Sequence, residues 1–127
     1  MRVLLDADIL IWHLRGEPKA GEHLRRLAGD PGIELWTGAM QRAEVLFFMR
    51  PHEEQKTMTL LSRIRTAAVD QAVIDEAGRL FRKWNPSHGI DPNDAILAAT
   101  ARIKGGQIHT LNLKHYPMKD VMVIKAW

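Results

Sequence analysis

Cysteine is absent from this chain of 127 residues. Disulfide bonds and thiolate-bound zinc are therefore excluded, and oxygen ligands remain for any metal. The six histidines show no paired spacing such as H-x-x-x-H, so we assign no histidine metal site. The chain also lacks the run of about twenty apolar residues that a membrane-spanning helix needs. We expect a cytoplasmic protein with no membrane association.

Repeats, low-complexity tracts and long linkers are missing as well. The chain is 46% hydrophobic and 26% charged, a composition typical of one compact domain, so we predict a single domain over residues 1–127. The formal net charge is +3 and the sequence pI is near 9.5. This weak signal favours a nucleic acid or an acidic partner segment without requiring either.

Apolar periodicity and turn residues divide the chain into short elements. We expect strands at residues 2–5, 33–36, 67–69, 107–109 and 121–124. We expect helices at about 7–15, 19–28, 39–49, 52–65, 70–83 and 92–104. Strands that alternate with helices predict an α/β fold, with a central, mostly parallel sheet of four to five strands flanked by helices.

Two acidic residues follow the first predicted strand. Asp6 comes directly after the apolar residues Val3 to Leu5, and Asp8 lies two residues further on. Sites in parallel α/β sheets form beyond the carboxyl ends of the strands, so both side chains can reach one crevice. The alternative is that either residue simply caps the first helix, because Asp is a favoured cap.

Glu44 lies inside the helix expected at 39–49. Spacings of three and four place it on the face that carries Met40, Phe47 and Phe48. A carboxylate on an apolar face is costly unless it is paired or binds a metal. The alternatives are a salt bridge to Arg42, Arg50 or another arginine, or a helix rotated so that Glu44 meets water.

The last predicted helix begins with three polar or turn-forming positions. Asp91 is expected to cap it, with Pro92 at the first helical position and Asp94 at the third. Asp94 either closes a capping arrangement with Asp91 or contributes its carboxylate to the sheet edge, because the alanines after it let the helix lie close to the sheet. Three or four converging acids would meet the oxygen-ligand requirement of Mg²⁺.

These motifs resemble those of PIN-domain endoribonucleases, and specifically of VapC-type toxins from bacterial and archaeal toxin–antitoxin pairs. The resemblance covers nearly the whole chain and is carried by VLLDADILIWHL, RAEVLF and GIDPNDAILAATARIKGGQIHTLNLKHY. It implies a PIN-like fold and hydrolysis of RNA phosphodiester bonds. It also implies that Mg²⁺ or Mn²⁺ is bound by Asp6, Glu44 and Asp94.

The fourth acidic position of the family differs in this chain. Asn112 stands where many relatives have a second Asp, so Asp8 or Asp91 could compensate as a metal ligand, and we expect one ion rather than two. By the resemblance, Thr110 and Asn112 position the water or the substrate. The candidates for contacts with RNA phosphates are Arg15, Arg42, Lys114 and His115.

The resemblance further implies a homodimer and a cognate antitoxin. The C-terminal segment of the antitoxin would lie over the active site, where an arginine could neutralise the metal ligands. We expect most large apolar side chains to be in the core, with part of VLFFM facing another subunit or a partner. The residues in question are Trp12, Trp36, Phe47, Phe48, Met49 and Trp84.

Two other classes of protein share some of these features. A phosphoacceptor receiver domain also has acids after its first strand, but it needs a Lys after a late strand, and residues 107–112 contain none. A catalytically silent PIN-like module that binds RNA is favoured by Asn112 and opposed by the three retained acids. Metal-dependent cleavage of RNA separates this module from an active enzyme.

Overall fold

Five short strands form one sheet in the computed structural model, which describes residues 1–127. All four pairings between neighbouring strands are parallel, and the strand order is β3-β2-β1-β4-β5. The predicted α/β class is confirmed, and the sheet is entirely rather than mostly parallel. The strands are β1 (Arg2–Leu5), β2 (Glu34–Gly38), β3 (Arg65–Ala67), β4 (Gln107–Thr110) and β5 (Val123–Lys125).

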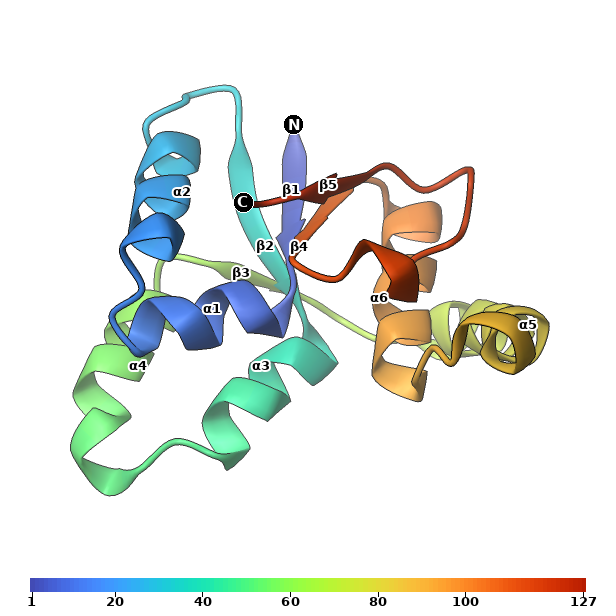
Figure 1. Ribbon diagram of the computed structural model, residues 1–127, viewed down its shortest axis with the longest axis horizontal. Helices are drawn as coiled ribbons and strands as arrows, with labels where there is room; N and C mark the ends of the chain where they lie inside the picture. The colour runs from blue at the N-terminus through green and yellow to red at the C-terminus, as the bar shows by residue number, and fades with distance from the viewer.

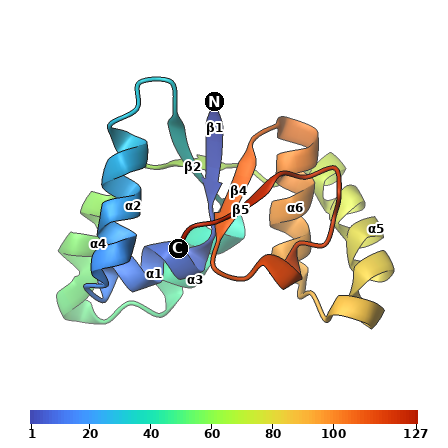
Figure 2. The ribbon, with the colours of Figure 1, turned by 45° about the horizontal axis from the view of Figure 1, so that its top comes forward.

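Helices connect the strands and cover both faces of the sheet. Figure 1 shows α1, α2 and α4 on one side of the sheet and α5 and α6 on the other, and Figure 2 shows the same division from a second direction. Two short 3-10 turns span Pro51–Glu53 and Leu113–His115. The helices are α1 (Ala7–Leu14), α2 (Pro18–Ala28), α3 (Ala39–Phe47), α4 (Glu54–Leu61), α5 (Gln71–His88) and α6 (Pro92–Lys104).

The central strand β1 is buried on both faces. Successive side chains of a strand point to opposite faces. Val3 and Leu5 accordingly join the core under α1, α2 and α4, whereas Leu4 joins the core under α5 and α6. None of the three side chains is accessible to solvent. This burial explains why the first strand is a continuous apolar run rather than an alternating pattern.

Small residues bring α6 close to the sheet, as the sequence predicted. Ala95, Ala98 and Ala99 are all buried beside Leu97 in the core on the α5 and α6 side. The helix begins as expected, because Asp91 accepts a hydrogen bond from the backbone N–H of Asp94 (2.8 Å) and Pro92 occupies its first turn. The start of α6 is thereby held near the carboxyl ends of the strands.

The helix ends differ most from the prediction in α4 and α5, while α3 ends at Phe47, two residues before the predicted end. Helix α4 begins at Glu54, because Pro51 opens a separate 3-10 turn, and it ends at Leu61 rather than near residue 65. Helix α5 continues to His88 with Pro86 in its last turn, five residues beyond the predicted end. Gly89 then terminates it with a φ of +62°, a conformation that glycine adopts without steric cost.

Several apolar side chains expected in the core are on the surface. Phe47 is 77% exposed, Phe48 is 83% exposed and Trp12 is 44% exposed. Trp36 and Trp84 are partly buried against the core on the α5 and α6 side. Trp12 is thus one of the exceptions to the expected core placement, and the exposure of Phe47 and Phe48 agrees with the expectation that part of VLFFM is not covered by this chain.

No helix has both the length and the apolar character needed to cross a membrane.

Candidate active site

The parallel pairing of β1 with β4 brings distant polar residues together at one edge of the sheet. Leu5 is in register with His109, so Asp6, which follows β1, lies beside Thr110, the last residue of β4. The Thr110 hydroxyl oxygen lies 2.9 Å from Asp6 Oδ2 and 3.2 Å from Asp8 Oδ2. Figure 1 shows the starts of α1, α3 and α6 near this edge.

Asp6 and Asp8 each accept hydrogen bonds from the backbone as well as facing Thr110. Asp6 Oδ1 accepts from the Ala7 N–H (2.8 Å), and Asp8 Oδ1 accepts from the Ile9 N–H (2.7 Å). Asp8 Oδ2 also accepts from the Leu111 N–H at 3.0 Å. The capping alternative is thus correct for Asp6, the N-cap of α1, whereas Asp8 lies within the first turn of the helix. For Asp6, capping coexists with placement at the sheet edge.

The hydroxyl of Tyr116 links the acid after β1 to the acid at the start of α6. Tyr116 Oη lies 2.7 Å from Asp6 Oδ2 and 3.3 Å from Asp94 Oδ1. The Tyr116 side chain is buried, and burial raises its pKa well above the usual value, with the nearby carboxylates adding to the effect. The phenol therefore stays protonated and can donate to one carboxylate at a time.

Both linked carboxyl groups hold their protons more tightly than usual. Burial, followed by the negative charge of Asp8, raises the pKa of Asp6 to about 7, although hydrogen bonds from Tyr116, Thr110 and the Ala7 N–H oppose the rise. Burial, followed by the charge of Asp91, raises the pKa of Asp94 to about 6. Ionising these groups inside the protein is costly without a compensating cation.

Glu44 lies on α3, near the same edge of the sheet, and its hydrogen-bond partner is an uncharged side chain. Asn93 Nδ2 donates to Glu44 Oε1 at 2.8 Å, and Glu44 forms no ion pair, so the predicted alternative of a salt bridge is wrong. Helix α3 buries the side that carries Gln41 and Val45, whereas the side that carries Phe47 is exposed. Burial raises the pKa of Glu44, with Asp91 and Asp8 contributing by charge repulsion.

The segment after β4 brings Asn112 and His115 to the site. Asn112 donates its backbone N–H to the Thr110 hydroxyl at 3.1 Å, and Asn112 Nδ2 lies 3.1 Å from His115 Nδ1. The same ring nitrogen lies 3.1 Å from Asp94 Oδ2. His115, predicted as a phosphate contact, therefore stands directly beside a proposed metal ligand.

The remaining phosphate-contact candidates lie apart from one another. Arg15 lines a hollow together with Glu44. Arg42 Nη1 donates to the Thr66 hydroxyl on β3 at 3.3 Å, and Lys114 is exposed without an ion pair. Of the four candidates, only Arg15 and His115 share a contact or a cavity with the acids.

The carboxylate side chains of the site supply the oxygen atoms and the negative charge that a hard divalent cation prefers. No three acidic or histidine side chains lie close enough together to coordinate one ion. Two hydroxyl groups, those of Thr110 and Tyr116, link the carboxylates of Asp6, Asp8 and Asp94, and each carboxylate also accepts from at least one backbone N–H. The nearby carboxylate oxygens, together with the raised pKa values of Asp6 and Asp94, fit oxygen ligands of a Mg²⁺ or Mn²⁺ ion, whose positive charge would favour their ionised forms.

Two residues of the site were not singled out from the sequence. Tyr116 is the only tyrosine of the chain and ends the TLNLKHY segment, which was the available signal. Asn93 lies between Pro92 and Asp94, where a polar residue also suits a helix start. Neither role follows from local sequence, because each depends on a partner far away in the chain.

Comparison with known sequences identifies related proteins. The chain matches the model of the PIN domain over residues 3–117. It is 34% identical over 116 residues to ribonuclease VapC19 of Mycobacterium tuberculosis, covering 91% of this chain and 92% of the relative. It is 32% identical over 117 residues to ribonuclease VapC10 of the same organism, covering 91% of this chain and 86% of the relative.

Solved structures share the same fold. VapBC-1 from nontypeable Haemophilus influenzae superposes with a TM-score of 0.80 at 19% identity, covering 99% of this chain and 98% of the other. A toxin–antitoxin complex from Klebsiella pneumoniae superposes with a TM-score of 0.79 at 23% identity, covering 98% of each chain. At these identities the likeness shows the fold alone, and the predicted architecture is confirmed.

Proposed function

This chain belongs to the PIN-domain family, and we propose that it is an endoribonuclease toxin that hydrolyses RNA phosphodiester bonds with Mg²⁺ or Mn²⁺. Two relatives at 32% and 34% identity are named ribonucleases, which supports the reaction class. The observation that carries the proposal is the pairing of Asp6 with Asp94 through one phenolic hydroxyl. It places two oxygen-only ligands with raised pKa values, the half-buried Asp6 and the buried Asp94, at the carboxyl edge of a parallel sheet.

Each side chain of the site has a role that follows from its contacts. Asp6 and Asp94 would hold the ion, with Glu44 and Asp8 nearby as further oxygen donors. Such an ion, when bound, lowers the pKa of a water molecule and neutralises charge that develops on the phosphoryl oxygens. Thr110 and Tyr116 orient the carboxylates by donating hydrogen bonds to them.

Other side chains are placed to contact the substrate. His115 stands beside Asp94 and Asn112 beside His115, where an imidazole and an amide can donate to phosphate oxygens or to an attacking water. Asp91 caps α6 and remains exposed. Its contribution is therefore to hold Asp94 in place and to add negative charge near the ion.

We also propose a cognate antitoxin and a homodimer as the assembled state. The solved structures with this fold include a VapBC pair and a toxin–antitoxin complex, which supports a protein partner. The exposed rings of Phe47 and Phe48 support an interface, because side chains of this size are depleted on free surfaces. Cellular RNA as substrate implies a cytoplasmic site of action.

Cleavage of RNA tests the proposed function directly. Purified antitoxin-free protein is incubated with labelled transfer and ribosomal RNA in Mg²⁺ or Mn²⁺, beside EDTA and an Asp94→Asn variant. We expect discrete cuts that disappear in both controls. RNA binding without any cleavage by the wild type would contradict the proposal and identify a silent module, for which Asn112→Asp is the informative rescue.

A further inference from the structure

A hollow lies where α5 and α6 meet the segment that joins β4 to β5, on the side of the sheet opposite α1, α2 and α4. Figure 2 shows this segment beside α6, with α5 next to α6. The volume of the hollow is about 410 Å³, within the usual range of sites for small molecules. None of the residues that line it belongs to the carboxylate site. We refer to it as the α5/α6 hollow.

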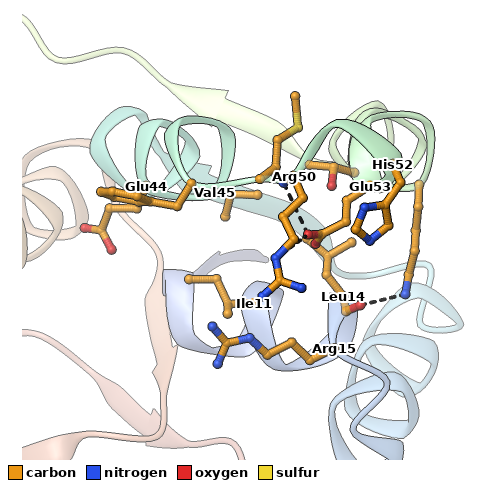
Figure 3. Close-up of a pocket in the computed structure, with 12 residues that line it drawn as sticks. Ile11, Leu14, Arg15, Glu44, Val45, Arg50, His52 and Glu53 are labelled. Carbon is orange, nitrogen blue, oxygen red and sulfur yellow. Dashed lines mark hydrogen bonds and ion pairs between the residues drawn. The ribbon is translucent and has the colours of Figure 1, made fainter.

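A larger hollow, of about 540 Å³, has a different character. It lies between α1, α3 and the segment that leads into α4, and Figure 3 shows Glu44 at one end of it, with Arg15 and Arg50 extending into it. Both Glu44 and Glu53 line it, so its charge is mixed. Through Glu44 it belongs to the candidate active site, whereas the α5/α6 hollow is separate from that site.

Positive charge dominates the rim of the α5/α6 hollow. Asp120 is the only carboxylate that lines it, and Glu76 pairs with two of the arginines that do. Four cations against these two carboxylates leave a net charge of +2. Like charges gathered in one hollow repel one another, and a bound anion removes that repulsion. The four cations are Arg79, Lys83, Arg102 and Lys119.

The two lysines are the cations without a counter-charge. Lys83 and Lys119 are exposed and form no ion pair. In contrast, Arg102 uses both terminal nitrogens, because Nη1 lies 2.9 Å from Glu76 Oε1 and Nη2 lies 2.9 Å from Asp120 Oδ2. A lysine ammonium binds phosphate as a point charge with three N–H donors. The lysines are therefore the groups that remain available to an anion.

The floor of the α5/α6 hollow is apolar. Leu80 and Met118 are buried beneath it, and Trp84 is partly buried against the same core. Lys83 Nζ lies 5.2 Å from the centre of the Trp84 ring, so a cation and an aromatic surface occur together at one wall. The hollow thus combines phosphate-binding groups at its rim with an apolar surface on which a heterocyclic base can rest.

We propose that the α5/α6 hollow binds the polyphosphate chain of a small molecule, with Lys83 and Lys119 contacting the phosphate oxygens. Several linked phosphates suit the hollow better than one, because the two lysines come from different elements and the net charge is +2. The chain belongs either to a nucleotide, whose base would use the apolar floor, or to an inorganic polyphosphate. The inference goes beyond the proposed function and does not require RNA cleavage, since the two sites share no residue.

Isothermal titration calorimetry with two probes tests this inference. Adenosine triphosphate and inorganic tripolyphosphate are titrated into the full chain in metal-free buffer at about 0.05 M salt, where screening is modest. Without a metal ion the carboxylate site repels both probes. Lys83→Gln and Lys119→Gln are compared with Lys19→Gln, because Lys19 is exposed, forms no ion pair and lies on α2 across the sheet.

We expect Lys83→Gln and Lys119→Gln each to weaken binding by about fivefold, and Lys19→Gln to leave it unchanged. Asp120→Asn should instead strengthen binding by about the same factor, because it removes the only carboxylate that lines the hollow. A gain of affinity cannot result from misfolding. Asp30→Asn is the matched control, since Asp30 is exposed in the turn before β2 and its bond to the Gly32 N–H can be kept by asparagine.

The two probes distinguish the sources of the polyphosphate chain. Tighter binding of adenosine triphosphate would identify a nucleotide as the ligand, and equal affinities would show that the phosphate chain alone is recognised; both results retain the inference. The absence of binding by the wild type would overturn it, as would equal losses in Lys83→Gln, Lys119→Gln and Lys19→Gln. Weakened binding of an RNA oligonucleotide in the two hollow variants, without binding of either probe, would also overturn it and assign the hollow to nucleic acid.

Discussion

Replacing Asp6 with asparagine should make the metal-free protein more stable at neutral and alkaline pH. The substitution preserves the shape of the side chain and its cap on α1, because Asn is as good a cap as Asp. The hydroxyls of Thr110 and Tyr116 can donate to the amide oxygen as they do to the carboxylate. The variant loses a negative charge that destabilises the folded protein when Asp6 is ionised.

The magnitude and sign of this stability difference follow from the pKa of Asp6. It rises from 3.8 to about 7 on folding, so the native state keeps a proton that the unfolded state releases in this window. The free energy of unfolding then falls by about 1.4 kcal/mol per pH unit, or about 4 kcal/mol across the window. Because part of the Asp6 side chain remains exposed, we expect about 2 kcal/mol after screening by solvent.

Urea unfolding followed by tryptophan fluorescence measures this difference. In EDTA, Asp6→Asn should be about 2 kcal/mol more stable than the wild type at about pH 8 and equal to it near pH 4. Added Mg²⁺ should stabilise the wild type, increasingly as pH rises, and should have little effect on the variant. Asp75→Asn is the matched control, since Asp75 is exposed on α5 and forms no ion pair.

Two outcomes would refute this reasoning. A variant that is less stable than the wild type at about pH 8 in EDTA would show that the Asp6 charge is well compensated within the protein. A stability difference that does not change between about pH 4 and pH 8 would show that the Asp6 carboxyl titrates in its ordinary range. Either result would also remove the electrostatic argument for a cation at this edge of the sheet.

The remaining predictions concern Tyr116 and Gly38. Tyr116→Phe removes a hydroxyl whose hydrogen bonds lower the pKa of both Asp6 and Asp94, so the pH midpoint of Mg²⁺-induced stabilisation should move upward; an unmoved midpoint would contradict the bridging role. In Gly38→Ala the new Cβ would overlap Gln41 Oε1 and press on Leu97, two buried side chains with little room to move, and we expect a loss of about 1–3 kcal/mol in urea unfolding. Gly78→Ala, whose Cβ meets only the flexible end of Arg82, should instead be neutral or stabilising, and equal effects of the two changes would rule out the steric explanation.

Elements whose signals lie within a few residues were predictable from the sequence. The start of α6 is an example, because the cap at Asp91, the proline after it and the third-residue acid all act on the same helical turn. The apolar run before Asp6 likewise identified a buried strand with an acid at its carboxyl end. The prediction failed where local signals conflict. The turn-forming residues around Pro86 predicted an earlier end of α5, but Pro86 lies within the last turn of the helix.

The surface of α3 shows why helical periodicity alone can mislead. Spacing placed Glu44 with Phe47 and Phe48 on one face, and that face was expected to be apolar and covered. In the structure both rings are exposed, and the helix buries Gln41 and Val45 instead. Periodicity defines which residues share a face, but only the neighbouring elements decide which face is buried.

The sequence by itself determined the kind and order of the elements and the presence of acids at strand and helix boundaries. The tertiary structure alone decided which side chains meet. Tyr116 reaches Asp6 across 110 positions of the chain, and Asn93 reaches Glu44 across 49. These contacts depend on strand order, register and rotamers, which are set by packing between segments, and no local propensity encodes them.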